Sequence, residues 1–201
     1  MVPEHELVVV PRDEWVSRSA DVFEVAIRDA VTQRDRCLIG VSGGNTPAAV
    51  FGELATRDLP WNKLVVIQVD ERIAALGSDE RNLTLQLWSF GDLPVRWLTL
   101  PMVEPIDEGL ATFLDELHNL AGTPPVLDIV HLGLGSDGHT ASLVPGDAVL
   151  NELQSDVATT GMYRGHRRVT LTRPILDRAR TVVWLVHGQS KAFALGRLLD
   201  A

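Results

Sequence analysis

The segment Cys37–Pro47, CLIGVSGGNTP, joins an apolar run to a glycine-rich loop and the start of a helix. Its first part, 37–42, is rich in Leu, Ile and Val, which indicates a buried β-strand. Thr46 is suited to cap a helix and Pro47 to occupy its first position, so we expect a helix over 47–56. A strand that leads directly into a helix is the building unit of a parallel α/β sheet.

The same alternation continues on both sides of this segment. We expect strands at 7–10, 37–42, 64–70, 96–100, 127–134, 157–162, 168–172 and 181–187, and helices at 13–32, 47–56, 82–90, 107–120 and 190–199. Apolar strands separated by helices predict a three-layer α/β fold, with a mainly parallel sheet covered by helices on both faces. A short loop with a glycine joins 157–162 to 168–172, which predicts a small antiparallel hairpin.

Composition limits the classes of protein that this chain can represent. The 201 residues are 45% hydrophobic and 22% charged, as expected for one globular domain over 1–201. Lys plus Arg is 18 and Asp plus Glu is 27, so the net charge is 18 − 27 = −9. A general nucleic-acid surface needs an excess of basic residues, so nucleic acid is excluded as a partner. A local pocket can still be positive and bind a small anion.

Cysteine use and hydropathy predict a cytoplasmic protein. The single cysteine, Cys37, lies in the apolar run and is expected to be a buried, inert thiol. The start Met1–Glu6 is acidic, unlike a signal peptide. No apolar run approaches the roughly 18 residues that a membrane helix needs, so we expect no membrane contact.

Ligands of parallel α/β sheets lie at the carboxyl ends of the strands. The loops after Val41, Val69, Leu134 and Val186 are therefore expected to line one site. In the loop 42–47, adjacent glycines allow backbone N–H groups to turn towards an anion, and the helix N-terminus adds partial positive charge. The loop thus predicts a phosphate cradle, with a simple tight turn as the alternative.

Two short patterns suggest other chemistry. Gly40–Gly44 fits G-x-S-x-G, the nucleophile elbow of α/β-hydrolases, but only two predicted strands precede it and no HGGG-type loop lies upstream. Gly133–Gly138 fits the dinucleotide pattern G-x-G-x-x-G, but no clear long helix follows it. Both interpretations are weaker than the phosphate cradle.

Charged residues follow two further strands. Arg72, in the run 70–72, could bind a carboxylate or phosphate or stabilise an oxyanion, although a solvated loop is the alternative. His139 stands two residues after Asp137 in a glycine-rich loop, where it can act as a general base and Asp137 can orient it or contact substrate. The chain has neither H-E-x-x-H nor paired C-x-x-C motifs, so we expect no metal.

The remaining basic and histidine residues are assigned by position. Lys191 lies in the first turn of the last predicted helix, where it opposes the helix dipole and needs an anion or solvent. Arg168 begins a predicted strand. His131 lies within a strand and is expected to be a packed or an edge residue, whereas His118 and His166 are expected to be ordinary surface residues.

The motifs taken in order resemble the 6-phosphogluconolactonase family. They are SGGNTP (42–47), VDER (69–72), RN (81–82), GLGSDGHTASLVPG (133–146), RRVTLT (167–172) and HGQSK (187–191). The matching blocks run from about Ile39 to Lys191, and GLGSDGHTASLVPG is the most diagnostic. SGG-x-TP is shared more widely with glucosamine-6-phosphate isomerases.

The resemblance implies a three-layer α/β fold and hydrolysis of 6-phosphoglucono-1,5-lactone to 6-phosphogluconate in the oxidative pentose phosphate pathway, without a cofactor. It implies a catalytic set in which His139 activates water, with Arg72 and Asp137 beside it. The implied substrate-binding set consists of Gly43, Gly44, Asn45, Thr46, Asp70, Asn82, Arg168 and Lys191. Arg168 and Lys191 match basic residues that bind the substrate phosphate.

Two other functions within the superfamily stay open as alternatives. A phosphosugar isomerase or deaminase shares the glycine-rich loop and the pair 70–71, but it has a glutamate shortly after its histidine, where this chain reads Ser142–Pro145. A non-catalytic sugar-phosphate sensor usually carries a DNA-binding helix-turn-helix, for which there is no room before Leu7. The retained Arg72 and His139 favour the lactonase.

The end of the chain departs from the family pattern. Members of the family usually continue past the helix that carries Lys191, whereas this chain stops at Ala201. A missing last strand would expose a sheet edge. A natural short form, a truncation and a sequence fault stay open as explanations, and reduced stability or compensating self-association would follow. We also expect a monomer or a weak homodimer.

Overall fold

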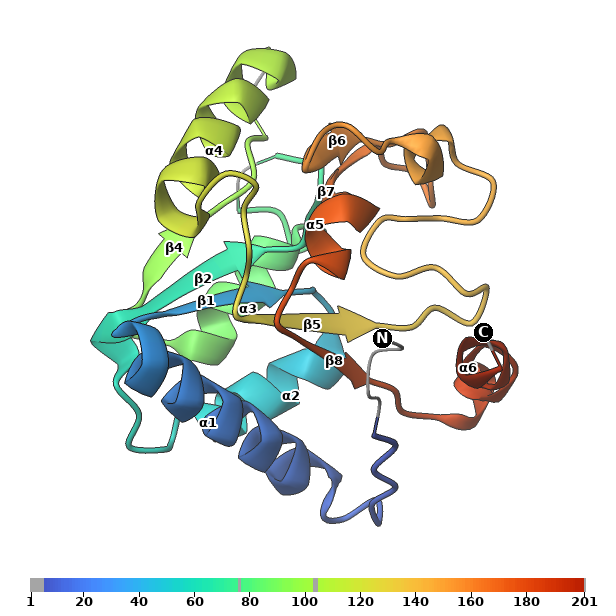
Figure 1. The fold of residues 1–201 in the computed structure, drawn as a ribbon. Helices are drawn as coiled ribbons and strands as arrows, with labels where there is room; N and C mark the ends of the chain where they lie inside the picture. The colour runs from blue at the N-terminus through green and yellow to red at the C-terminus, as the bar shows by residue number, and fades with distance from the viewer. Residues whose placement is uncertain (1–5, 76, 103–104, 201) are drawn as a thin grey trace.

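The computed structural model describes residues 6–75, 77–102 and 105–200, and its centre is a five-stranded parallel sheet (Figure 1). The strands lie in the order β4 (Arg96–Leu98), β2 (Leu64–Gln68), β1 (Cys37–Val41), β5 (Ile129–Gly133) and β8 (Thr181–Leu185). Every neighbouring pair is parallel. All five carboxyl ends therefore lie at one edge, where loops from distant parts of the chain can build a site.

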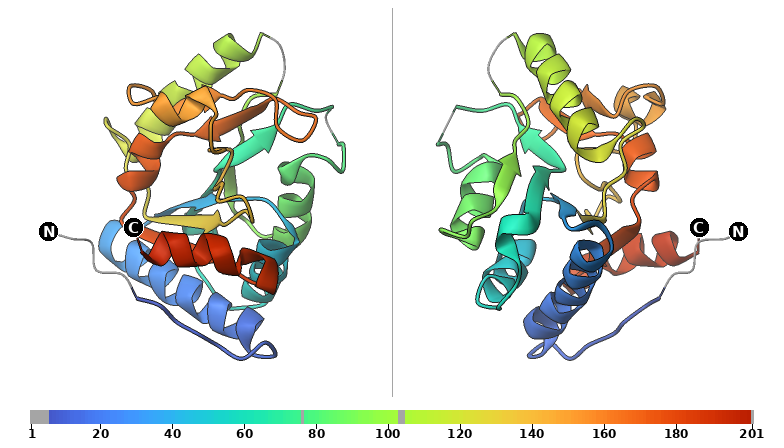
Figure 2. Two further views of the ribbon diagram at one scale, coloured as in Figure 1. Left: turned by 90° about the vertical axis from the view of Figure 1, so that its right-hand side faces the viewer. Right: turned by 60° about the vertical axis from the view of Figure 1, so that its left-hand side comes forward.

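Helices cover both faces of this sheet, which gives the expected three layers (Figures 1 and 2). One face packs on α1 (Trp15–Arg34), α2 (Asn45–Leu54) and the end of α3 (Asn82–Phe90), and the other on α4 (Ile106–Ala121) and α5 (Arg173–Asp177). Each face of the sheet has its own hydrophobic core, and alternate residues of β1 point into one or the other. Ile39 packs with α1 and α2, and Leu38 packs with α4. Continuous burial on both faces explains the unbroken apolar character of the strands.

A second, smaller sheet stands on the α4 and α5 side. It contains β3 (Asp70–Arg72), β7 (Arg168–Leu171) and β6 (Val157–Thr159), in that order and all antiparallel. The predicted hairpin 157–172 is thus confirmed. The predicted strand 64–70 is wrong at its end, because the chain leaves the main sheet after Gln68 and pairs with β7 from Asp70 onward.

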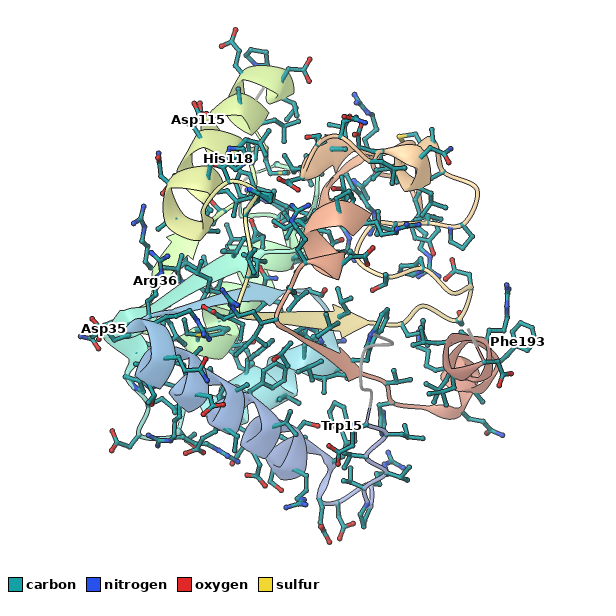
Figure 3. The ribbon with its side chains drawn as sticks, viewed as in Figure 1. Trp15, Asp35, Arg36, Asp115, His118 and Phe193 are labelled. Carbon is teal, nitrogen blue, oxygen red and sulfur yellow. The ribbon has the colours of Figure 1, made fainter. Side chains whose placement is uncertain are left out.

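The start of α1 and the segment that follows β8 lie on the carboxyl side of the sheet (Figure 1). After β8 come a 3-10 turn, η3 (Gln189–Lys191), and α6 (Ala192–Leu199) in place of one predicted helix. The ring of Trp15, labelled in Figure 3, lies 5.3 Å from the ring of His187, centroid to centroid. This contact ties the start of α1 to the loop that follows β8.

Other expectations on local structure were wrong in identifiable ways. Residues 7–10 form no strand, and Leu7, Val8 and Val9 are exposed, because no strand in the described ranges pairs with them. The short helix α5 was missed, and two 3-10 turns, η1 (Trp61–Lys63) and η2 (Ala148–Asn151), were missed as well. The acidic start at 1–5 lies outside the described residues.

The start of α2 also differs from the expectation. The helix begins at Asn45, with Gly44 as its N-cap, so Thr46 does not cap it. Gly44 has φ +117°, a conformation that favours glycine, and its carbonyl accepts the first helical bond from the N–H of Ala48 at 3.2 Å. The glycine conformation, rather than a side-chain cap, sets where this helix starts.

Candidate functional site

His139 lies in the loop that follows β5, beside a carboxylate. Its Nδ1 is 2.5 Å from Oδ1 of Asp137, and one-fifth of the histidine side chain is exposed. The backbone folds tightly here, because the N–H of Gly135 donates to the carbonyl of His139 at 2.7 Å and Gly138 has φ +89°. A Cβ at position 135 would lie 2.1 Å from His139 Nδ1, so only glycine allows the two side chains to meet there.

Tyr163 completes this cluster from the loop between β6 and β7. Its hydroxyl donates to Oδ2 of Asp137 at 2.7 Å, and its ring lies edge-on to the His139 ring at 5.3 Å. Burial raises the pKa of Asp137, but the hydrogen bonds from Tyr163 and His139 outweigh it and hold the pKa well below its usual range. An ionised carboxylate only accepts, so Nδ1 of His139 carries the proton and Nε2 is left as the basic nitrogen.

A cavity of about 240 Å³ opens beside these residues. It is lined by Arg72, Glu80, His139, Tyr163, Arg164, His166 and Arg168. Three arginines and one glutamate give the wall a positive balance on a chain whose net charge is −9. Such a pocket suits a small anionic ligand that presents groups for bidentate guanidinium binding.

Two of the arginines are held opposite each other in the small sheet. Arg72 pairs with Arg168 in the register of β3 and β7, and Arg72 Nη1 donates to the carbonyl of Glu80 at 2.5 Å. Arg168 is buried, and its Nη1 lies 3.9 Å from Oδ2 of Asp70. Two facing strands thus aim both guanidinium groups at one cavity.

Asp70 is not among the residues that line the cavity, but it contacts residues that support it. Its Oδ2 accepts from the hydroxyl of Ser142 at 2.6 Å, and its Oδ1 accepts from Nδ2 of Asn82 at 3.3 Å. Burial raises the pKa of Asp70, although Ser142 and Arg168 act against that shift. The structure places this carboxylate as a support for Arg168, and direct substrate contact by Asp70 stays a prediction.

The neighbouring carboxylate, Glu71, organises the loop before α3. It is fully buried and accepts hydrogen bonds from Gln68 Nε2 and from the backbone N–H groups of Arg72, Asn82 and Leu83, all between 2.7 and 2.9 Å. Two of these N–H groups belong to the first turn of α3, so Glu71 satisfies donors that a helix start leaves free. The sequence analysis assigned no role to Glu71.

The glycine-rich loop lies next to Asn82 and outside the 240 Å³ cavity. A Cβ at Gly43 would lie 2.1 Å from Oδ1 of Asn82, so glycine is required for this close approach. Within the described ranges, the N–H groups of Gly44, Asn45 and Thr46 donate no hydrogen bond. These free donors are compatible with the predicted phosphate cradle, and the structure places Asn82 between them and Asp70.

Ser42 does not have the geometry of a nucleophile. It is buried, and its hydroxyl donates to the backbone carbonyl of His131 at 3.0 Å rather than to a histidine nitrogen. The dinucleotide pattern 133–138 likewise continues into turns without a helix. The first pattern does lie between a strand and a helix, but its serine hydroxyl has no histidine nitrogen as partner, and the second pattern lacks the helix that a dinucleotide site needs.

Lys191 lies apart from the cavity at the end of η3. Its backbone N–H donates to the carbonyl of Gly188 at 3.0 Å, but no residue in the described ranges forms a hydrogen bond or ion pair with its side-chain ammonium group, so its role in phosphate binding stays a prediction. Of the four loops expected to line one site, those after Val69 and Leu134 reach the cavity. Those after Val41 and Val186 do not.

Several cavity residues were missed from the sequence. Tyr163, Arg164 and His166 come from the loop between β6 and β7, and Glu80 comes from the loop before α3. His166 Nε2 is 3.4 Å from Oε1 of Glu80, so His166 is not the ordinary surface residue that we expected. A cluster of basic residues inside a predicted hairpin loop, YRGHRR at 163–168, was the available signal.

The other assigned side chains are structural. His131 is fully buried, as expected, and Cys37 is buried with its thiol pKa raised to about 12 by burial. His118 on α4, labelled in Figure 3, is half-buried with Nε2 3.7 Å from Oδ2 of Asp156. In the described part of the chain, no three His, Cys, Asp or Glu side chains gather as metal ligands would, and no helix could span a membrane.

Comparisons with known proteins agree with this architecture. The family model described as glucosamine-6-phosphate isomerases/6-phosphogluconolactonase matches residues 11–201. A protein from Synechocystis sp. named 6-phosphogluconolactonase is 34% identical over 201 residues, which cover 95% of this chain and 83% of that protein. A protein of the same name from Nostoc sp. is 30% identical over 195 residues, which cover 91% and 80%.

Solved structures share the fold. The crystal structure of a 6-phosphogluconolactonase from Shewanella baltica has a TM-score of 0.86 at 24% identity and covers 96% of this chain and 85% of its own. The 6-phosphogluconolactonase structure from Thermotoga maritima has a TM-score of 0.84 at 25% identity, with 94% and 88% covered. The chain belongs to the family of glucosamine-6-phosphate isomerases and 6-phosphogluconolactonases.

Proposed function

We propose that this protein hydrolyses 6-phosphoglucono-1,5-lactone to 6-phosphogluconate, the lactonase step of the oxidative pentose phosphate pathway. The observation that carries the proposal is the His139–Asp137 pair, 2.5 Å apart, at the wall of a cavity with three arginines. The pair supplies a general base, and the arginines supply charge for a phosphate and an oxyanion. The relatives from Synechocystis sp. and Nostoc sp. carry the name of this activity.

In the proposed mechanism, Nε2 of His139 takes a proton from water as the water oxygen bonds to C1 of the lactone. The carbonyl oxygen becomes an oxyanion, and Arg72 stabilises its charge. When this intermediate collapses, the bond between C1 and the ring oxygen breaks. The imidazolium of His139 returns its proton to the ring oxygen, and the new carboxylic acid ionises. Water is the only co-reactant, so no redox carrier takes part.

Phosphate binding is proposed for the basic residues and the glycine-rich loop. Arg168 lines the cavity. Among the described residues, none forms a hydrogen bond or ion pair with the side-chain ammonium group of Lys191 or with the N–H groups at 44–46. The substrate phosphate would have to bring Lys191 and the glycine loop nearer to the arginines. We also propose that 1–201 act as one domain, in the cytoplasm, as a monomer or weak homodimer.

An isomerase or deaminase function has less support from the site. The carboxylate nearest His139 is Asp137, which engages Nδ1 and Tyr163 and so serves the histidine. The segment after His139 reads Thr140–Pro145 without a glutamate. A second acid for proton transfer between carbon atoms is therefore not supplied by this loop.

A coupled assay tests the proposal. Glucose-6-phosphate dehydrogenase makes the lactone in place, and 6-phosphogluconate dehydrogenase reports the product as NADPH. Because the lactone also opens spontaneously, the signal is the excess rate over a protein-free control. We expect His139→Ala to lose about 10²–10⁴-fold in kcat, the usual contribution of a positioned general base. No excess rate from folded wild-type protein would refute the proposal.

A further inference from the structure

We propose that Tyr163 is a positioning residue, which clamps the Asp137 carboxylate and thereby holds His139 with Nε2 free to act as a base. The kinetic part of this inference rests on the proposed function. The contact itself does not, because it is a property of the free protein. Tyr163 is the only tyrosine in the chain, which allows the contact to be tested directly.

The Asp137 carboxylate needs a second fixed point. Its side chain is 39% exposed, so water can compete for its oxygens, and rotation about its side-chain bonds would break the contact with His139. Tyr163 donates to Oδ2 at 2.7 Å while Oδ1 stays 2.5 Å from Nδ1 of His139. With one oxygen held on each side, the carboxylate plane is fixed and the histidine tautomer follows.

The backbone of Tyr163 is itself fixed by a tight turn. Its N–H donates to the carbonyl of His166 at 2.9 Å, and the N–H of His166 donates back to the carbonyl of Tyr163 at 3.2 Å. The two residues between them, Arg164 and Gly165, both have positive φ, at 49° and 87°. This is the two-residue turn of a regular hairpin, which holds its flanking residues in a defined orientation.

The ring of Tyr163 contacts two cations. The guanidinium carbons of Arg164 and Arg168 are each 5.1 Å from its ring centroid, within the range of a cation–π contact. Arg168 is buried on β7 and paired with Asp70, so it is a rigid support. Tyr163 thus transmits the rigidity of the small sheet to a loop of the main sheet.

The hydroxyl of Tyr163 is a donor and not an acid in this arrangement. Burial raises its pKa, and donation to the Asp137 carboxylate raises the pKa further. The phenol therefore stays protonated at neutral pH and its one proton is committed to Asp137. The other charged and titratable groups that face this cluster are Arg72, Glu80, Arg164, His166 and Arg168.

The first test is Tyr163→Phe, which removes the hydroxyl and keeps the ring. We expect kcat to fall about tenfold, as for a lost hydrogen bond to a charged group, with KM nearly unchanged because the hydroxyl faces Asp137. We also expect the acid limb of the kcat/KM profile to move to higher pH, since a carboxylate without its donor binds the His139 proton more strongly. Thr32→Val, which removes an exposed hydroxyl on α1, is the matched control.

The second test does not depend on activity. Nitrogen NMR of the histidines should show His139 with its proton on Nδ1 in the wild type, and a mixture of tautomers in Tyr163→Phe and Asp137→Asn. Tyrosinate absorbance should titrate above the ordinary range in the wild type and closer to it in Asp137→Asn. Since there is one tyrosine, the signal belongs to Tyr163.

The outcomes separate the two proposals. An unchanged His139 tautomer in both variants, together with an unchanged tyrosinate titration in Asp137→Asn, would overturn the positioning role, even if kcat fell. If the His139 tautomer changes in the variants but the wild-type protein has no lactonase activity, the positioning role is supported and the proposed function is refuted. Loss of kcat together with a tautomer shift, with the Thr32 control intact, is the result we expect.

Discussion

His131 and His139 come from one strand and the loop that follows it, yet their surroundings are opposite. His131 is fully buried against the rings of Phe23 and Phe51, its Nδ1 accepts from the N–H of Ser42 at 3.2 Å, and its Nε2 has no partner in the described structure. Burial lowers its pKa to about 3. His139 has a carboxylate on Nδ1 and a cavity beside it. A charged partner and access to solvent, rather than residue type, make a base.

The largest expected effect comes from exchanging each histidine for asparagine. His139→Asn should lose about 10²–10⁴-fold in kcat because the base is gone, while the free energy of unfolding falls by no more than about 1 kcal/mol, the usual net contribution of a hydrogen bond such as that to Asp137. His131→Asn should do the reverse and lower the free energy of unfolding by about 1–3 kcal/mol, since it leaves a core cavity. Urea unfolding and the coupled assay on both variants measure this. Equal losses of activity in His139→Asn and His131→Asn would contradict the assignment of His139 as the base and His131 as a structural residue.

Acid should expose the second difference. The pKa of His131 is about 3 in the folded protein and about 6.5 when unfolded, so between these values the unfolded chain binds more protons. Stability is therefore fully present above about pH 6.5 and falls by about 1.4 kcal/mol per pH unit below it, on the order of 5 kcal/mol in total. His131→Asn should remove this part of the pH dependence of the unfolding free energy and leave the part that comes from the carboxylates. Parallel curves of unfolding free energy against pH would show the assignment to be wrong.

Two glycines around the His139 loop sharpen the comparison further. A Cβ at Gly135 would lie 2.1 Å from His139 Nδ1 and 2.4 Å from Asp137 Oδ1, whereas a Cβ at Gly133 meets nothing within 4 Å. We expect Gly135→Ala to displace the pair and lower kcat by about 10²-fold, as for a misplaced catalytic group. Gly133→Ala is the matched control and should keep kcat. Similar rates in both variants would show that the loop tolerates a shifted histidine.

The smallest expected effect is at Ser42, which contacts His131 and not His139. Ser42→Ala removes the hydroxyl that donates to the His131 carbonyl, so the free energy of unfolding should fall by about 1 kcal/mol. The rate should persist, because Ser42 is not a nucleophile in the proposed mechanism. Thermal melting and the coupled assay check both parts. Complete loss of activity in a folded variant would instead support the interpretation of Ser42 as the nucleophile of an α/β-hydrolase elbow.

Much of the fold was predictable because burial on both faces leaves a strong pattern. The helix 82–90 and the strands of the main sheet follow from apolar runs and their spacing. The strand 7–10 was wrong because apolar residues alone do not guarantee a neighbouring strand. The passage of the chain from the main sheet to the small sheet at Val69 could not be predicted. Val69, Asp70 and Glu71 are all buried, and hydropathy does not show to which sheet a strand belongs.

The candidate site was predictable in its motifs and not in its contacts. His139 and Asp137 are two residues apart, so their proximity is local, and Arg72 lies at a strand end. Tyr163 reaches Asp137 only because the small sheet folds back across the end of β5, a contact between residues 26 apart in sequence. Lys191 shows the converse, since a resemblance proposes its role while the structure keeps it away from the cavity.

Val69 has a consequence for how the protein opens. Its N–H donates to Val41 in the main sheet at 3.0 Å, and its carbonyl accepts from Leu171 in the small sheet at 2.7 Å. One fully buried residue is thus shared by two hydrogen-bonded ladders. Local unfolding of the small sheet would remove Arg72, Arg168 and Tyr163 from the cavity together, while the loop that carries His139 would stay attached to the main sheet. A bound anion would therefore slow amide exchange across β3 and β7 as one cooperative unit.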